Sequence, residues 1–456
     1  MPTPPARPMP LRRSLGVVDA TTLGVGSMVG AGVFVVFSPV AARAGGLLWA
    51  ALLAAGGIAV ANALAVAALA AAHPHSGGAY LYGRLRLGRW PGFLAGWGFV
   101  TGKTASCAAM AHAFATYAAP GAAVPLAIGA VAAVTAVNLL GITRTAGAAR
   151  LLAAPVVGLL AFVVAASFAS PGHPAPLPAS AQPTAWAVLQ AAGLLFFAFA
   201  GYARIATLGE EVKDPERTIP AAIALALGFT LVLYGLLAAA LVHLLGVDGL
   251  AAATAPVREA VILLGAPAWL AAAGAALASL GALMALLAGI SRTALAMARE
   301  GDLPARFAAV SPKRSVPWLA EVSVAAVVVV LLLSTDPTTI IGFSSFGVLV
   351  YYAVANAAAL TLPRRNGKLG TGKLPAGGRR PDIPTPEPAQ PGPAQPEPSR
   401  PPRPWYCPRW LNAAGLAGCL LLAFTLPGAS VATMLAVFAA GVAVRAVALA
   451  VRRRAG

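Results

Sequence analysis

The chain has 456 residues, of which 59% are hydrophobic and only 10% are charged. A soluble chain carries roughly 25% charged residues, so this composition favours an integral membrane protein. Three cysteines, Cys107, Cys407 and Cys419, are too few and too scattered to predict a disulfide framework or a metal cluster. The net charge of +18 could suggest nucleic acid, but the positions of the basic residues favour another explanation.

Apolar segments of spanning length recur along the whole chain. A helix needs about 20 residues to cross the hydrocarbon core. By this measure we predict an all-α membrane protein with about twelve transmembrane helices. They lie near residues 15–42, 46–72, 91–119, 122–141, 150–170, 185–208, 220–246, 266–291, 317–334, 338–362, 408–426 and 429–450.

The basic residues lie almost entirely on one side of these spans. With the N-terminus inside, all but four of the 32 Lys and Arg residues are cytoplasmic. The exceptions are Arg43 and Arg258, which face out, and Lys103 and Arg204, which lie within spans. This asymmetry predicts a multi-pass protein of the cell membrane with both termini in the cytoplasm. The basic surplus then contacts anionic lipid headgroups and predicts no nucleic-acid partner.

Two stretches differ in composition from the spans and set the domain boundaries. Residues 1–14 are a cytoplasmic leader, and residues 364–407 are a Pro- and Arg-rich stretch that cannot bury a core. We expect the second stretch to be a disordered linker that acts as a spacer, and we identify no obligate protein partner. The remaining segments are a first half (15–170), a second half (185–363), two final helices (408–450) and a basic tail (451–456).

The first span contains four glycines in nine residues, Gly24-Val-Gly-Ser-Met-Val-Gly-Ala-Gly32. Each glycine costs about 1 kcal/mol relative to alanine in a helix interior, so the helix is expected to open there. Freed backbone at membrane depth is tolerated only where it is buried in protein or lines a cavity. The sequence therefore predicts a broken helix and a binding site, as in a transporter.

The sixth span repeats this feature in Phe196-Phe-Ala-Phe-Ala-Gly-Tyr-Ala-Arg204. Five spans separate the two breaks, so the second half must be inverted in the membrane. Interrupted segments at matching positions of two halves point to a substrate site. The alternative is that these glycines only permit close helix packing.

Half-helix ends determine the expected chemistry. Unpaired N–H groups where the first span restarts, near residues 31–34, favour a carboxylate. Free carbonyls near residues 26–28 and near Phe199 and Ala200 favour an ammonium group. A zwitterionic α-amino acid satisfies both poles without an ionised side chain.

At these residues the chain resembles the amino acid–polyamine–organocation superfamily, and bacterial amino acid transporters in particular. The matching stretches are Gly26-Ser-Met-Val-Gly-Ala-Gly-Val-Phe34, residues 196–220 with Glu210-Glu-Val-Lys-Asp-Pro-Glu-Arg-Thr-Ile-Pro220, and Ser291-Arg-Thr-Ala-Leu-Ala-Met-Ala-Arg-Glu-Gly-Asp-Leu-Pro304. The resemblance implies a five-plus-five inverted repeat with discontinuous helices 1 and 6, two further C-terminal helices, and alternating access around a central site.

The resemblance also implies roles for particular residues. The substrate carboxylate would be held by Ser27, Met28, Val29, Gly30, Ala31 and Gly32. The amino group would be held by Phe199, Ala200, Gly201 and Tyr202. Phe197 matches an aromatic gate position, although a Phe on an apolar helix is by default a packing residue.

Lys103 is the first of three unusual residues within the spans. Proton-coupled relatives often carry a lysine in the fifth span, which here reads Ala153-Ala-Pro-Val-Val-Gly158 without one. Lys103 stands in the third span instead, and an ionisable residue near the midplane is a functional candidate. We interpret Lys103 as the coupling or charge-balancing residue, with a fixed charge bound to backbone carbonyls as the alternative.

Arg204 and Ser279 are the other two. Arg204 cannot relay protons, and pairing with Glu210 or Glu211 is preferred over anion binding. Ser279 in the eighth span could offer a hydroxyl near the first break, or it could bond to its own helix backbone.

The leading prediction is a secondary active transporter, with proton-coupled uptake of neutral amino acids. The alternatives are amino acid exchange and transport of cationic amino acids or polyamines. A channel is less consistent with the sequence, which has no repeated charged or carbonyl ring. The spans show no paired acids, Ser/His pair or metal ligands at depth, so we predict no enzyme, metal or cofactor.

Overall fold

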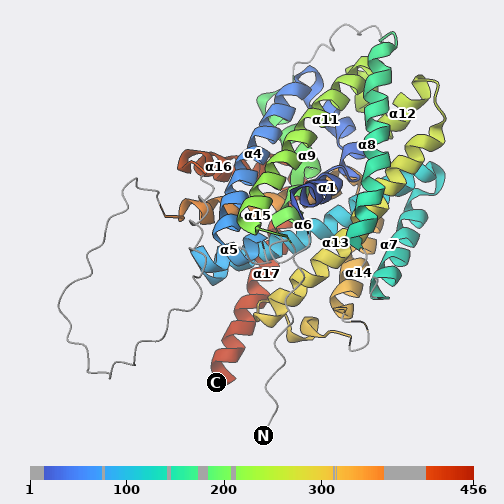
Figure 1. The fold of residues 1–456 in the computed structure, drawn as a ribbon. Coiled ribbons are helices and arrows are strands. Elements are labelled where there is room, and N and C mark those ends of the chain that lie inside the picture. The colour runs from blue at the N-terminus through green and yellow to red at the C-terminus, as the bar shows by residue number, and fades with distance from the viewer. Residues whose placement is uncertain are drawn as a thin grey trace, which may run out of the picture.

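The computed structural model of the protein is predominantly helical in the part of the chain that it describes (Figure 1). The structure describes residues 15–73, 78–140, 145–172, 183–206, 212–311, 314, 316–363 and 407–455. The predicted leader and nearly all of the predicted linker therefore lie outside the described residues. The one isolated bridge among these residues pairs Leu15 with Val212.

The helices follow the predicted spans closely. The first half contains α1 (Val17–Met28), α2 (Gly32–Val35), α3 (Phe37–Ala44), α4 (Leu48–Ala72), α5 (Gly78–Leu87), α6 (Arg89–Ala118), α7 (Ala123–Leu139) and α8 (Thr145–Ala169). The second half contains α9 (Ala185–Phe199), α10 (Ala203–Ala206), α11 (Pro215–Ala252), α12 (Pro256–Leu263), α13 (Ala268–Arg299), α14 (Trp318–Ser334) and α15 (Pro337–Leu360). The last helices are α16 (Arg409–Thr425) and α17 (Gly428–Ala455), and short 3-10 turns η1 (Gly45–Leu47), η2 (Pro120–Ala122), η3 (Ala200–Tyr202) and η4 (Ala305–Ala308) connect some of the elements.

Eight helical segments in the described residues are long and apolar enough to cross a membrane. Three further apolar helical segments are shorter, at Ala153–Ala169, Trp318–Ser334 and Arg409–Thr425. Helix α6 has 30 residues but is not among the eight. The all-helical membrane class is thus confirmed, while the number of twelve spans and the inverted repeat remain predictions.

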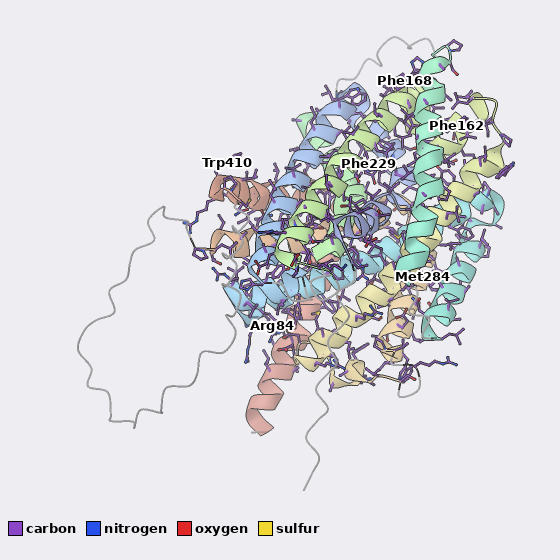
Figure 2. All side chains as sticks on the ribbon, in the orientation of Figure 1. Arg84, Phe162, Phe168, Phe229, Met284 and Trp410 are labelled. Atoms are coloured by element: carbon purple, nitrogen blue, oxygen red, sulfur yellow. The ribbon has the colours of Figure 1, made fainter. Side chains whose placement is uncertain are left out.

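Large apolar side chains face outward on several of these helices. Phe162 and Phe168 on α8, Phe229 on α11 and Trp410 on α16 are all exposed, and Figure 2 labels them on their helices. Large apolar side chains exposed on many helices are expected where lipid covers the protein. The outer face is therefore the one that a bilayer would contact.

Helix α15 is the most buried of the candidate spans and packs against α6. The contact is made by glycines: a methyl group on Gly347 would lie 2.5 Å from the Gly98 carbonyl oxygen and 2.7 Å from the Gly102 Cα. Small residues let two backbones approach closely where no hydrophobic force drives helices together in lipid. The pair α6 and α15 therefore forms a close-packed wall beside the two broken helices.

A buried ion cluster, formed by Tyr80, Arg84, Asp302 and Arg445, fastens α17 to α5 and to the loop after α13. Asp302 accepts from the Tyr80 hydroxyl (2.9 Å) and Arg84 Nη1 (2.8 Å), and Arg445 Nη2 lies 2.7 Å from its other oxygen. Burial and the Asp302 carboxylate hold the pKa of Tyr80 well above its usual range. The Arg445 guanidinium also lies 4.4 Å from the Trp90 ring centroid, where cation–π attraction adds to the ion pair.

We predict that Arg445→Met lowers the free energy of unfolding by roughly 2 kcal/mol, because a hydrogen bond to a buried charge is lost. Thermal unfolding of the detergent-purified protein measures this change. The matched control is Glu300→Gln, since Glu300 also pairs with Arg84 (2.6 Å) but is 55% exposed. We expect the control to lose less than about 1 kcal/mol. Equal losses in the two variants would contradict the role assigned to the buried cluster.

Candidate functional site

The first span is broken where its glycines predicted. Helix α1 ends at Met28, Val29 leaves the helical conformation with ψ of 48°, and α2 begins at Gly32. The α1 segment therefore stops in the predicted region 26–28, and the chain restarts within 31–34. Gly24 and Gly26 remain helical and Gly32 begins α2, so Gly30 is the one glycine of the run that lies between the two helices.

The sixth span is broken at the matching position. Helix α9 ends at Phe199, η3 covers Ala200–Tyr202, and α10 follows for one turn. The tighter 3-10 turn changes the direction of the chain and leaves helix carbonyls without their usual partners. Discontinuity of both predicted helices is thus a feature of the structure.

The two breaks touch each other. A methyl group on Gly201 would lie 2.3 Å from the Ser27 carbonyl oxygen and 2.6 Å from the Met28 nitrogen. On the other side, a methyl group on Gly32 would lie 3.0 Å from the Ala198 Cα. Glycine is therefore required at both positions for the backbones to meet.

Tyr234, on the continuous helix α11, joins the two broken ends. Its hydroxyl lies 2.7 Å from the Met28 carbonyl oxygen and 3.2 Å from that of Ala198. Both are carbonyls near helix ends that have no water available, so a hydroxyl donor lowers the cost of burying them. The sequence analysis did not identify Tyr234; its signal is a tyrosine hydroxyl within a mostly apolar stretch of α11, which must find a partner.

Lys103 lies at the second break, on α6. Its ammonium donates to the Ala200 carbonyl at 3.2 Å, and the side chain is only 6% exposed. The Tyr352 hydroxyl of α15 lies 3.4 Å from the same carbonyl. The geometry contains the carbonyl contact that the alternative interpretation expected, and it leaves the coupling role as a prediction.

Two aromatic residues close the site around η3. Tyr202 stacks on Tyr352 with ring centroids 4.9 Å apart. Phe197 is buried and faces Gly32, where a methyl group would lie 3.3 Å from its ring. Phe197 therefore lies between the two breaks, as a gate would, and its gating role remains a prediction.

The structure places Ser279 and Arg204 less decisively. Ser279 is buried on α13, and its hydroxyl makes no hydrogen bond among the described residues. The same helix approaches the first break, since a methyl group on Gly30 would lie 3.2 Å from the Ala282 Cβ. Arg204 lies half-buried on α10, and its expected partners Glu210 and Glu211 lie outside the described residues.

Glu321 departs from what its place near a span end suggests. It is buried in the first turns of α14, where its carboxylate accepts from the Asn138 side-chain amide at 2.7 Å. Asn138 also donates to the Met284 carbonyl of α13. The acid thus belongs to a contact among α7, α13 and α14.

Two discontinuous helices that meet inside an apolar helical bundle define a class of membrane transporter. The comparisons with known proteins agree with this geometry. The amino acid permease family model matches residues 15–444, and the chain belongs to that family.

The relatives carry transporter names. A Mycobacterium tuberculosis protein named uncharacterized transporter is 48% identical over 452 residues, with 98% of this chain and 94% of the relative covered. Cationic amino acid transporter 7, chloroplastic, of Arabidopsis thaliana is 29% identical over 76% of this chain and 65% of its own length. The branched-chain amino acid permease BcaP of Bacillus subtilis is 28% identical over 68% of this chain and 72% of its own length.

We predict that Gly201→Ala forces the two breaks apart and destabilises the protein by about 1–3 kcal/mol, the usual range for overpacking. Uptake of labelled amino acids into proteoliposomes should fall with the melting temperature. Gly228→Ala on α11 is the control, because a methyl group there meets nothing within 4 Å. Normal uptake and stability in Gly201→Ala would show that the contact between the breaks is dispensable.

Proposed function

We propose that the protein is a secondary active transporter that carries neutral amino acids across the cell membrane by alternating access. One observation carries this proposal: the two unwound segments meet inside the bundle, with Gly201 against Ser27 and Gly32 against Ala198. Family membership supports an amino acid substrate. The predicted orientation, with both termini in the cytoplasm, belongs to the same proposal.

The two poles of an amino acid have matching groups on the chain. Of the residues 27–32, Gly30, Ala31 and Gly32 would offer backbone N–H groups to the carboxylate, because the N–H of Val29 donates to Val25 and residues 27 and 28 belong to α1; the carbonyls of Phe199 and Ala200 would hold the ammonium. Phe197 would cover the bound substrate and Ser279 would add a hydroxyl from α13.

Charge favours neutral over cationic substrates. Among the described residues, Lys103 of α6 contacts the second break at Ala200, and Arg204 of α10 follows that break in the chain. The buried carboxylate of Glu321 accepts a hydrogen bond from Asn138. The buried carboxylate of Asp302 pairs with Arg84 and Arg445. Within the described part of the chain, a cationic amino acid would therefore meet like charge and no free buried carboxylate.

Two alternatives remain within transport. Relatives named cationic amino acid transporters favour a cationic substrate. The second alternative concerns how transport is driven. The sequence favours uptake together with a proton, and exchange of one amino acid for another is the alternative. Protons would act through Lys103.

A panel of amino acids and blocked analogues tests the two-pole site. We expect neutral α-amino acids to compete for uptake into proteoliposomes, and N-acetylated or methyl-esterified analogues to compete about 100-fold less well, because each leaves one backbone pole unpaired.

The outcomes separate the alternatives. Preference for lysine or arginine would favour the cationic substrate class. Equal competition by the blocked analogues would contradict the two-pole site, and no transport of any amino acid would refute the proposed function.

A further inference from the structure

The amine pole of the proposed site is already occupied by the protein itself. The carbonyl of Ala200, where a substrate ammonium would bind, accepts from the ammonium of Lys103 at 3.2 Å. Lys103 reaches this carbonyl from α6, 97 residues earlier in the chain, and is buried there. An amino acid ammonium must therefore share this carbonyl with Lys103 or replace it.

Two ammonium groups cannot both bind there at low cost. At contact distance, two like charges in a poorly solvated site repel by several kcal/mol. Among the described residues no carboxylate pairs with Lys103 to offset the second charge. The lower-energy arrangement keeps one positive charge at Ala200, either that of Lys103 or that of the substrate.

Lys103 is the group at this carbonyl that can exchange a proton. Titratable and charged groups on the elements that carry or pack against α6 and the second break include Cys107 and His112 on α6, Tyr202 on η3, Arg204 on α10, Arg292 on α13, Tyr351 and Tyr352 on α15, and Glu321 on α14. The tyrosines and the cysteine are buried and remain neutral, and an arginine keeps its proton. The carboxylate of Glu321 accepts a hydrogen bond from Asn138.

We propose that the substrate ammonium and the Lys103 ammonium compete for the Ala200 carbonyl, so that amino acid binding releases one proton. This inference rests on the proposed function and selects proton–amino acid antiport over proton co-transport. In the step, Lys103 changes from ammonium to amine, its proton passes to water on the side to which the site is open, and the substrate ammonium takes the hydrogen bond.

This competition sets the direction in which protons move relative to the amino acid during transport. The protein changes between its inward-open and outward-open conformations while it carries either a substrate or a proton, but not both. Amino acid movement in one direction is therefore driven by proton movement in the other. An acidic interior should drive accumulation in proteoliposomes, and an acidic exterior should oppose it.

Binding affinity as a function of pH tests the inference directly. We expect the apparent Kd for a neutral amino acid to fall about tenfold for each pH unit while Lys103 carries its proton. In weakly buffered solution, a pH indicator should report about one proton released per substrate bound.

Three variants isolate the lysine. Lys103→Met should bind substrate with a pH-independent Kd and release no proton, because the competing charge is absent. Lys103→Arg keeps a permanent charge and should bind weakly at every pH. Lys213→Met, an exposed lysine after the second break, is the matched control and should behave like the unmodified protein.

Each outcome decides the question. Affinity that weakens as the pH rises, or accumulation driven by an acidic exterior, would overturn the inference in favour of co-transport. Affinity independent of pH in the unmodified protein would overturn it in favour of a fixed structural charge. If neither the unmodified protein nor Lys103→Met binds an amino acid at any pH, the proposed function fails together with the inference.

Discussion

Every backbone N–H and carbonyl at membrane depth needs a partner inside the protein, and the rest of the structure follows from how that need is met at the two breaks. A continuous helix satisfies its own backbone, whereas an interrupted one leaves groups open. The structure pairs the two interrupted segments with each other, through glycines that admit backbone contact. The open groups are thereby concentrated in one place, which is the condition for a backbone-built substrate site.

Side chains on continuous helices complete the pairing. Tyr234 on α11 serves one carbonyl from each break, while Lys103 on α6 and Tyr352 on α15 both reach the carbonyl of Ala200. A hydroxyl satisfies a carbonyl without adding charge, but an ammonium adds one. That difference makes Lys103 the residue at which charge and substrate binding become linked.

The rest of the molecule holds this centre in place. The glycine contact between α6 and α15 sets the position of Lys103 and Tyr352 relative to η3. At the end of the bundle that contains α5, the Asp302 cluster fixes α17 and α5 to the loop after α13. Rigid support of this kind is what permits short unwound segments to keep a defined geometry.

The sequence by itself determined the membrane class, the helical architecture, the position of both breaks and the family resemblance. These follow from local properties, namely apolar length and the low helix propensity of glycine, which a reader of the chain can assess within about 20 residues. The family match confirmed the resemblance over residues 15–444.

Only the tertiary structure decided which side chain serves which free carbonyl. Tyr234 lies 206 residues from Met28, and Lys103 lies 97 residues from Ala200, so no local pattern predicts either contact. The same is true of Glu321, whose hydrogen-bond partner Asn138 lies on α7, far away in the chain. Partner choice is set by the packing distances between helices, and those depend on all the contacts of the bundle together.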